Sequence, residues 1–175
     1  MPKYKMGLFL PTNNSLLESL TFQPLNPHED TQYWDQAASL AEEKWGYIRR
    51  FPGVDERKKL IRNPKYHFYI MRYAEHFIGM FALLNYPIDF QTKIKAQELV
   101  SFYVCEEFRS FGVGAALFKE ALKICHKHQA NTLVWDTLNP NLNGFWQRRH
   151  AQIVCDSQIL GQPTTLFRID VPKPS

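Results

Sequence analysis

One run of residues has the composition of an anion-binding turn: Arg109-Ser110-Phe111-Gly112-Val113-Gly114, at the joint between a predicted strand and a predicted helix. Two glycines this close allow a sharp turn and let a ligand approach the main chain. The first turn of a helix also offers amide donors without partners, at the end where the helix dipole is positive. The joint therefore predicts an anion site that suits a pyrophosphate, although a tight turn alone would also explain the glycines.

Two common phosphate-binding motifs do not fit this joint. A P-loop requires the pattern Gly-x4-Gly-Lys-Ser/Thr, and the joint has neither that spacing nor the lysine. A dinucleotide-binding fingerprint requires a third glycine where this chain has Leu117. Both motifs are therefore rejected.

A strand and a long helix position the joint. Alternating apolar residues predict a strand over 96–104, and apolar residues at helical spacing predict a helix that begins at Ala115. The same patterns predict strands over 18–27, 131–138, 151–160 and 164–170, a hairpin over 66–87 that turns at 74–76, and helices over 28–51, 54–62 and within 139–150. This order predicts the α/β (α+β) class, with a mixed sheet and helices on both faces. Residues 1–17 read as a loosely held N-terminal arm, and residues 18–175 as a single domain.

Composition and charge narrow the class of protein. With 175 residues, of which 45% are apolar, the chain is typical of one packed domain. The net charge of +4 is mild and no five like charges are consecutive, so we expect no nucleic-acid partner. No segment reaches the roughly 18 apolar residues that a membrane helix requires. Cys105, Cys125 and Cys155 lack the spacing of metal ligands, so we expect reduced thiols, no metal site and a cytoplasmic protein.

The pattern Arg109-x-x-Gly112-x-Gly114 between such a strand and helix resembles the acyl-CoA-binding motif of the GCN5-related N-acetyltransferases (GNAT). The resemblance extends through the order of the elements from Leu20 to Asp170. It implies a single GNAT-like domain with a mostly antiparallel sheet, a β-bulge that lets two neighbouring strands splay, and acetyl-CoA (coenzyme A) as acyl donor. It also implies cofactor-binding residues along the strand, the joint and the start of the helix: Phe102, Tyr103, Val104, Arg109, Ser110, Phe111, Gly112, Val113, Gly114 and Ala115.

The resemblance implies transfer of an acetyl or other short acyl group to a primary amine, on a small molecule or a peptide, by direct attack in a ternary complex. The attacking amine must lose a proton. Glu98 is the candidate base because it precedes Arg109 by the same interval as the catalytic glutamate of histone-acetylating relatives. A solvent-exposed carboxylate at the strand end is the alternative reading. The amide N–H of Phe102 is the implied donor to the oxyanion.

The family often supplies a tyrosine hydroxyl near the departing sulfur, in a segment that begins with an asparagine. Asn139 matches that asparagine and Trp146 stands at the tyrosine position, so we expect both to line the cofactor. An indole N–H is a hydrogen-bond donor but no acid at neutral pH. Tyr103 is therefore the second catalytic candidate, with a core position as its alternative. A non-catalytic CoA-binding or protein-interaction module of the same fold stays open.

The residues that would bind the acceptor amine are less clearly marked in the sequence. In the family the acceptor pocket is shaped by the segment before the hairpin and by the last loop. That position implies roles for Trp34, Trp45, Tyr47, Phe51 and residues 159–165, although helix packing would also explain the aromatic residues.

Basic residues give a further set of expectations. Arg148 and Arg149 could meet the 3'-phosphate of the cofactor, as could Lys119 or Lys123, or they could be solvated. His150 stands where relatives often have a glycine, and we read it as a surface residue. The N-terminal arm could pack over the sheet or mediate a homodimer.

Overall fold

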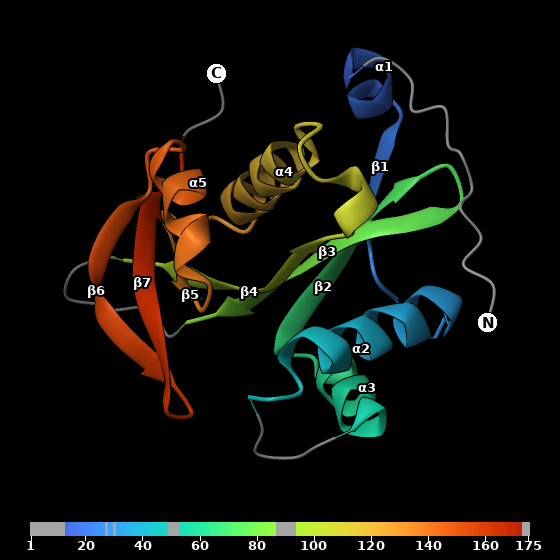
Figure 1. The fold of residues 1–175 in the computed structure, drawn as a ribbon, viewed down its shortest axis with the longest axis horizontal. Helices are drawn as coiled ribbons and strands as arrows, with labels where there is room; N and C mark the ends of the chain where they lie inside the picture. The colour runs from blue at the N-terminus through green and yellow to red at the C-terminus, as the bar shows by residue number, and fades with distance from the viewer. Residues whose placement is uncertain (1–12, 27, 30, 49–52, 87–93, 173–175) are drawn as a thin grey trace.

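Seven strands form one sheet in the computed structural model, in the order β1-β2-β3-β4-β5-β7-β6 (Figure 1). The structure describes residues 13–26, 28–29, 31–48, 53–86 and 94–172. Neighbouring strands are antiparallel except β4 and β5, which are parallel. The strands are β1 (Leu20–Pro24), β2 (Tyr66–Tyr73), β3 (His76–Asn85), β4 (Ala96–Val104), β5 (Thr132–Thr137), β6 (Gln152–Ile159) and β7 (Gln162–Asp170).

Helices cover both faces of the sheet, as the sequence predicted (Figure 1). One face carries α2 (Thr31–Trp45) and α3 (Val54–Arg62), and the other carries α4 (Val113–Lys127) and α5 (Asn143–Gln147). The remaining elements are α1 (Asn13–Glu18) and two single turns, η1 (Glu106–Phe108) and η2 (Pro140–Leu142). Each face has its own hydrophobic cluster, so the sheet is buried between two cores. The mixed, mostly antiparallel sheet that the resemblance implied is confirmed.

Helix α4 forms where the sequence predicted a long amphipathic helix. Its core-facing stripe recurs at a spacing of three and four residues: Val113, Leu117, Phe118, Ala121, Ile124 and Cys125. The helix begins at Val113, two residues before the predicted start at Ala115. Gly112 precedes it with a φ of 83°, a left-handed conformation that favours glycine, and this residue turns the chain into the helix.

Strand β4 contains a bulge that the sequence could not reveal. Met80 on β3 pairs with Tyr103, and Ala82 pairs with Val100, so Ser101 and Phe102 together oppose one residue of β3. Ser101 has a φ of 55°, which is unusual for a residue with a side chain. The bulge shifts the alternation of the strand by one position.

Because of this shift, consecutive side chains at the end of β4 pack on opposite faces of the sheet. Phe102 packs against the cluster that contains α4, and Tyr103 packs against the cluster that contains α2. On the other side of the strand, β4 pairs with β5 only from Ala96 to Glu98. Beyond Glu98 the two strands diverge, and β5 continues paired with β7 alone. The structure therefore shows the splayed strands that the resemblance implied.

The predicted N-terminal arm lies partly outside the described residues. Residues 1–12 belong to that part, whereas residues 13–17 form most of α1. Leu16 is fully buried in the cluster on the α4 face, so this end of the arm is held in the core.

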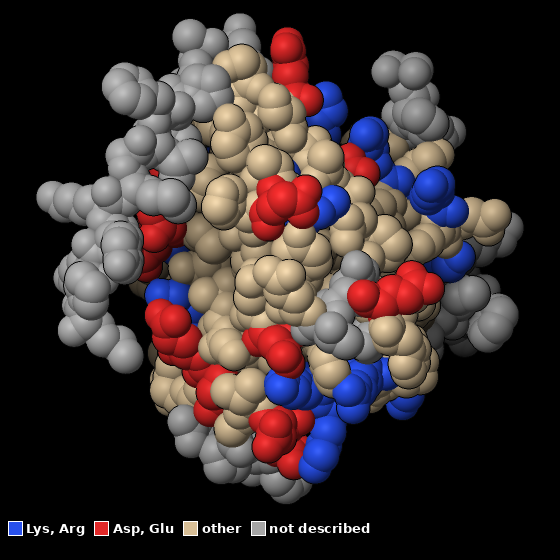
Figure 2. All heavy atoms as spheres, turned by 90° about the vertical axis from the view of Figure 1, so that its right-hand side faces the viewer, with Lys and Arg blue, Asp and Glu red and all other residues tan. Residues whose placement is uncertain are grey.

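The side of the molecule that lies to the right in Figure 1, with α2 and α3 in its lower part, has interspersed charges (Figure 2). Lys58 lies 2.7 Å from Asp35, and Lys59 lies 2.6 Å from Glu56. Neighbouring opposite charges of this kind give no large field of one sign on this face. The prediction that the chain has no nucleic-acid partner stays a prediction.

Candidate active site

Two adjoining cavities open along the divergent part of β4. The first, which we call the glycine-loop cavity, has a volume of about 540 Å³ and is lined by β4, the loop before α4, and α5. The second, which we call the splay cavity, has a volume of about 420 Å³ and lies between β4 and β5, with the ends of α2 and α3 on its far side. The wall common to both cavities is formed by Phe102, Tyr103, Asn139, Leu142 and Trp146.

The start of α4 presents free amide donors to the glycine-loop cavity. The first hydrogen bond of the helix runs from the amide of Ala116 to the carbonyl of Gly112, at 3.0 Å. The amides of residues 113–115 precede that bond, and no side chain caps the helix at Gly112. A Cβ atom at Gly114 would lie 3.4 Å from the ring of Phe145, an ordinary contact, so the start of α4 lies close to α5 along this wall. This arrangement suits an anion that approaches the main chain closely.

Positive charge surrounds the same cavity. Its described lining holds Arg109, Arg148 and Arg149 and contains no carboxylate. The guanidinium of Arg149 stacks 3.6 Å from the ring centroid of Phe145, and its Nη1 donates to the carbonyl of that residue at 2.7 Å. Burial, together with the charge of Arg148, lowers the pKa of Arg149. Three guanidinium groups beside free amides fit the diphosphate and phosphate groups of coenzyme A.

Arg109 has a structural contact as well as a place in the cavity wall. Its Nε donates to the carbonyl of Val104 at 3.0 Å, and its guanidinium lies 5.2 Å from the ring centroid of Tyr103. These contacts hold the loop against the end of β4. The side chain is still about half exposed, so it can also face a ligand.

The structure brings together ten of the twelve residues predicted to bind the cofactor. They line the glycine-loop cavity and are Phe102, Tyr103, Val104, Arg109, Ser110, Gly112, Gly114, Ala115, Asn139 and Trp146. The side chains of Phe111 and Val113 do not line it. Phe111 packs against the core on the α4 face, and Val113 is fully buried there, so only their main-chain groups can face a ligand.

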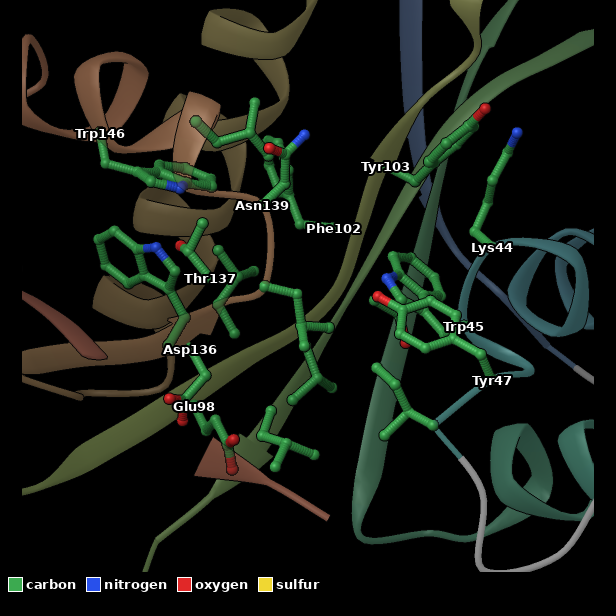
Figure 3. A pocket seen from close by; sticks show the side chains of 18 of the residues that line it. Lys44, Trp45, Tyr47, Glu98, Phe102, Tyr103, Asp136, Thr137, Asn139 and Trp146 are labelled. Atoms are coloured by element: carbon green, nitrogen blue, oxygen red, sulfur yellow. The ribbon is translucent and has the colours of Figure 1, made fainter. Parts of the chain in front are cut away.

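Two carboxylates occupy one end of the splay cavity (Figure 3). Glu98 pairs in register with Val134 of β5, and Asp136 follows two residues later on the same face of that strand. Burial raises the pKa of Glu98, a hydrogen bond with Tyr86 lowers it, and the charge of Asp136 raises it. Asp136 accepts a hydrogen bond from the hydroxyl of Thr164. A half-buried carboxylate with a raised pKa has the property that a general base requires.

Tyr103 lies on the opposite side of the splay cavity from Trp146 (Figure 3). Its ring meets Trp45 edge-on with centroids 6.3 Å apart, and the ammonium of Lys44 lies 5.6 Å from its centroid. Burial raises the pKa of Tyr103, and the neighbouring charge of Lys44 lowers it. The phenol therefore stays protonated at neutral pH and can donate a hydrogen bond.

Trp146 is a buried member of an aromatic cluster. Its side chain is 3% exposed, and its ring centroid lies 5.0 Å from that of Trp135 and 5.2 Å from that of Phe102. Its indole nitrogen has no hydrogen-bond partner among the described residues. It lines both cavities, and its contact with the cofactor stays a prediction.

The residues expected around the acceptor divide into two groups. Trp45, Tyr47 and Ile159 line the splay cavity. Trp34 does not line it, because its ring is buried in the α2–α3 cluster with the guanidinium of Arg62 at 3.6 Å from its centroid. Phe51 lies outside the described residues.

Sequence reasoning missed several residues of the splay cavity. Asp136, Trp135 and Thr137 come from β5, and Lys44 and Arg57 come from the far side. Asp136 had a visible signal, because it is the one charged residue of the strand predicted over 131–138. The others had none, since the distance between β5 and α2 is set by the whole fold.

His150 ends the segment after α5 with a φ of 65°. Its amide donates to the carbonyl of Gln147 at 3.0 Å, and its side chain is exposed. This left-handed turn explains why relatives often place a glycine at this position. His150 is therefore a turn residue on the surface, as predicted.

Two kinds of feature are absent from the described part of the chain, a metal-ligand cluster and a membrane-spanning helix. No group of three or more His, Cys, Asp or Glu side chains there could hold a metal ion. Among the same residues, no helix combines the length and the hydrophobicity needed to cross a bilayer.

Solved acetyltransferases share this fold. An aminoglycoside 6'-N-acetyltransferase complexed with coenzyme A superposes with a TM-score of 0.70 at 14% identity, over 89% of this chain and 99% of that one. An acetyltransferase from Streptococcus agalactiae gives a TM-score of 0.66 at 15% identity, over 87% of this chain and 99% of that one. FeeM, an N-acyl amino acid synthase from uncultured soil microbes, gives 0.66 at 15% identity, over 88% and 92%.

Sequence comparison gives the family. No curated protein sequence matches the chain. A family model described as the acetyltransferase (GNAT) family matches residues 17–150, which is more than half of the chain. The chain therefore belongs to the acetyltransferase (GNAT) family.

Proposed function

We propose that this protein transfers an acetyl or other short acyl group from acetyl-CoA to a primary amine by direct attack in a ternary complex. The observation that carries the proposal is the common wall of the two cavities. One cavity gathers free amides and arginines, the other holds two carboxylates, and the two meet where β4 and β5 diverge. A site of this form can hold an anionic donor and a cationic acceptor side by side.

The glycine-loop cavity is proposed to hold the donor. Acetyl-CoA, when bound, supplies an activated acyl thioester. The amides of residues 113–115 and the guanidinium groups of Arg148 and Arg149 bind its phosphates. Main-chain groups at the end of β4, from Phe102 to Val104, lie along the side that β5 leaves unpaired and can bind the pantetheine arm as an added strand.

The splay cavity is proposed to hold the amine. Glu98 and Asp136 attract an ammonium group, and Glu98 accepts the proton that the amine loses before it attacks. Tyr103 and the indole of Trp146 flank the meeting point of the cavities and donate hydrogen bonds there. The departing group is a thiol with an ordinary pKa of about 8.5, so hydrogen bonding can suffice without a strong acid.

Direct attack is favoured over an acyl-enzyme route by the lining residues. An enzyme nucleophile requires a lowered pKa or a neighbouring base. None of the described residues that line the two cavities is a cysteine or a histidine. Burial raises the pKa of the neighbouring Cys105 thiol to about 11, so that thiol is protonated at neutral pH.

Release of free thiol from acetyl-CoA tests the proposal. The panel of acceptors comprises simple amines, polyamines, amino acids, peptide N-termini and an aminoglycoside, the last because one structural neighbour is an aminoglycoside acetyltransferase. Glu98→Gln should lower the rate by about 100-fold, the contribution of a general base, while calorimetry shows unchanged affinity for coenzyme A. Glu107→Gln, which removes an exposed carboxylate after β4, is the matched control.

A non-catalytic CoA-binding module is the second candidate, because Trp146 replaces the tyrosine that the family often uses. Tight binding of coenzyme A with no thiol release for any acceptor would favour this candidate. Absence of binding at millimolar acetyl-CoA, with the protein folded, would overturn both.

A further inference from the structure

Three buried hydrogen-bond donors of the splay cavity have no partner. They are the indole nitrogens of Trp135 and Trp146 and the hydroxyl of Thr137, and none has a hydrogen-bond partner among the described residues. The three residues are 2%, 3% and 5% exposed, and all three line the cavity. Buried polar groups are rarely left unpaired in proteins, so three around one cavity indicate an acceptor atom, supplied by an ordered water or by a ligand, within the site.

The chemistry of these donors defines what they would bind. An indole N–H donates and cannot accept, so two of the three groups require an acceptor atom. The surrounding wall is aromatic: the Trp135 ring centroid lies 5.4 Å from that of Phe118 and 5.7 Å from that of Phe167. An apolar wall with a few neutral donors suits the oxygen of an uncharged group. A carboxylate is less suitable, because Glu98 and Asp136 line the same cavity.

The position of the donors assigns the oxygen to the acyl donor. Trp135 and Trp146 belong to the core on the α4 face, where Phe102 also lies. Thr137 follows Trp135 by two residues, so it points to the same side of β5, whereas Asp136 points to the other side. Trp146 lines both cavities, and Trp135 and Thr137 line only the splay cavity. A chain that enters from the glycine-loop cavity therefore reaches Trp146 first and then the other two donors.

We propose that Trp135, Thr137 and Trp146 form an acyl-selectivity site that binds a keto or hydroxyl oxygen located on the acyl chain beyond the thioester. The site rests on the proposed function, because it presumes an acyl-CoA donor. Such a site makes the protein prefer a donor whose short acyl group carries an oxygen over a donor whose acyl group is a hydrocarbon chain. The transfer itself is unchanged: Glu98 takes one proton from the ammonium group before attack, one C–N bond forms, and one C–S bond breaks with its electron pair left on sulfur, which takes the second amine proton and leaves as the thiol.

Two donors of equal length test this site. Acetoacetyl-CoA and butyryl-CoA both carry four acyl carbons and differ by a keto oxygen. Calorimetry with the full chain should give an affinity about tenfold higher for acetoacetyl-CoA, which corresponds to about 1.4 kcal/mol. Thr137→Val, which keeps the shape and removes the hydroxyl, should reduce that ratio about threefold, and Trp135→Phe should reduce it by a similar factor.

Nuclear magnetic resonance of the indole N–H groups gives a readout independent of turnover. The chain has four tryptophans, so four indole signals are expected. Those of Trp135 and Trp146 should move downfield with acetoacetyl-CoA and stay nearly unmoved with butyryl-CoA. Trp34, buried in the α2–α3 cluster, is the internal control and should respond to neither. If Trp135→Phe does not fold, the wild-type spectra and Thr137→Val decide the outcome.

The outcomes separate the two proposals. Equal affinities with unmoved indole signals, while acetyl-CoA binds and is turned over, would overturn the acyl-selectivity site alone. If the affinity ratio is unchanged in Thr137→Val and the indole signals do not move, the oxygen binds elsewhere. That result would also overturn the acyl-selectivity site. Failure of acetyl-CoA and of both longer donors to bind would overturn the proposed function itself.

Discussion

The two glycines of the joint should respond in opposite ways to the same substitution. Gly112 has a φ of 83°, and an added Cβ there would meet only Leu17, at 3.4 Å. The cost of Gly112→Ala is therefore conformational, about 1–2 kcal/mol for an L-residue in a left-handed conformation. The lower entropy of the unfolded alanine chain offsets about 0.4–1 kcal/mol of this. We expect a net loss of about 1 kcal/mol in the free energy of unfolding.

Gly114 lies in the first turn of α4, where alanine is favoured over glycine by about 0.5–1 kcal/mol. Its added Cβ would lie 3.4 Å from two atoms of the Phe145 ring and 4.0 Å from Val104, which are ordinary contacts. Gly114→Ala should therefore stabilise the fold by about 0.5 kcal/mol. The family itself accepts glycine or alanine at this position of the motif.

Urea denaturation of both variants measures the difference, which should be about 1.5 kcal/mol between them. Calorimetry with coenzyme A gives the second readout. Gly112→Ala should lower the affinity by about tenfold or more, because the amides that follow lose their orientation, and Gly114→Ala should change it by less than about threefold. Shifts of the same sign in both variants would refute the assignment of the turn to the left-handed conformation of Gly112.

Further predictions concern charge, turn geometry and pH. Arg149→Ala should weaken coenzyme A binding by about tenfold at low salt, because a charge-assisted contact is lost. Lys123→Ala should not weaken it, because the ammonium group of Lys123 lies 3.0 Å from Glu120. Equal effects of the two substitutions would place the phosphate site on α4. His150→Gly should raise the free energy of unfolding by about 0.5–1 kcal/mol and the melting temperature by about 1–4 °C, and no gain would contradict the left-handed turn. Burial raises the pKa of Glu98, so its contribution to stability falls as the pH rises above the ordinary value of 4.5. Glu98→Gln should therefore be more stable than wild type at pH 7 and equal to it below pH 4.5. Urea titrations at both pH values measure this, and a variant less stable than wild type at pH 7 would contradict it.

The sequence predicted the elements better than the site. Helix α3 begins and ends at the predicted residues 54 and 62, because Gly53 precedes it and its pattern is strongly periodic. The start of α4 was placed two residues late, because a glycine in the first turn hides a helix start from propensity. Local signals of this kind need no knowledge of the rest of the chain.

The site depends on contacts that no local pattern encodes. The bulge at Ser101 exists because β3 and β4 pair with a shifted register, which is a property of two strands. Trp34 and Trp45 lie on the same helix, yet one packs into the core and the other lines the splay cavity. Alternation along β5 places Trp135 and Thr137 on one face of the strand, but it does not show that they border a cavity.

The short pairing of β4 with β5 also links substrate binding to the integrity of the fold. Strands β1–β4 and strands β5–β7 meet through only three residue pairs, from Ala96 to Glu98 on one side and from Thr132 to Val134 on the other. A donor whose amide groups bond to the free edge of β4 extends that junction. Amide hydrogens near residues 100–104 should then exchange with solvent more slowly, and the melting temperature should rise with donor concentration by mass action. In the proposed complex the acyl donor is thus an eighth strand of the sheet as well as a reactant.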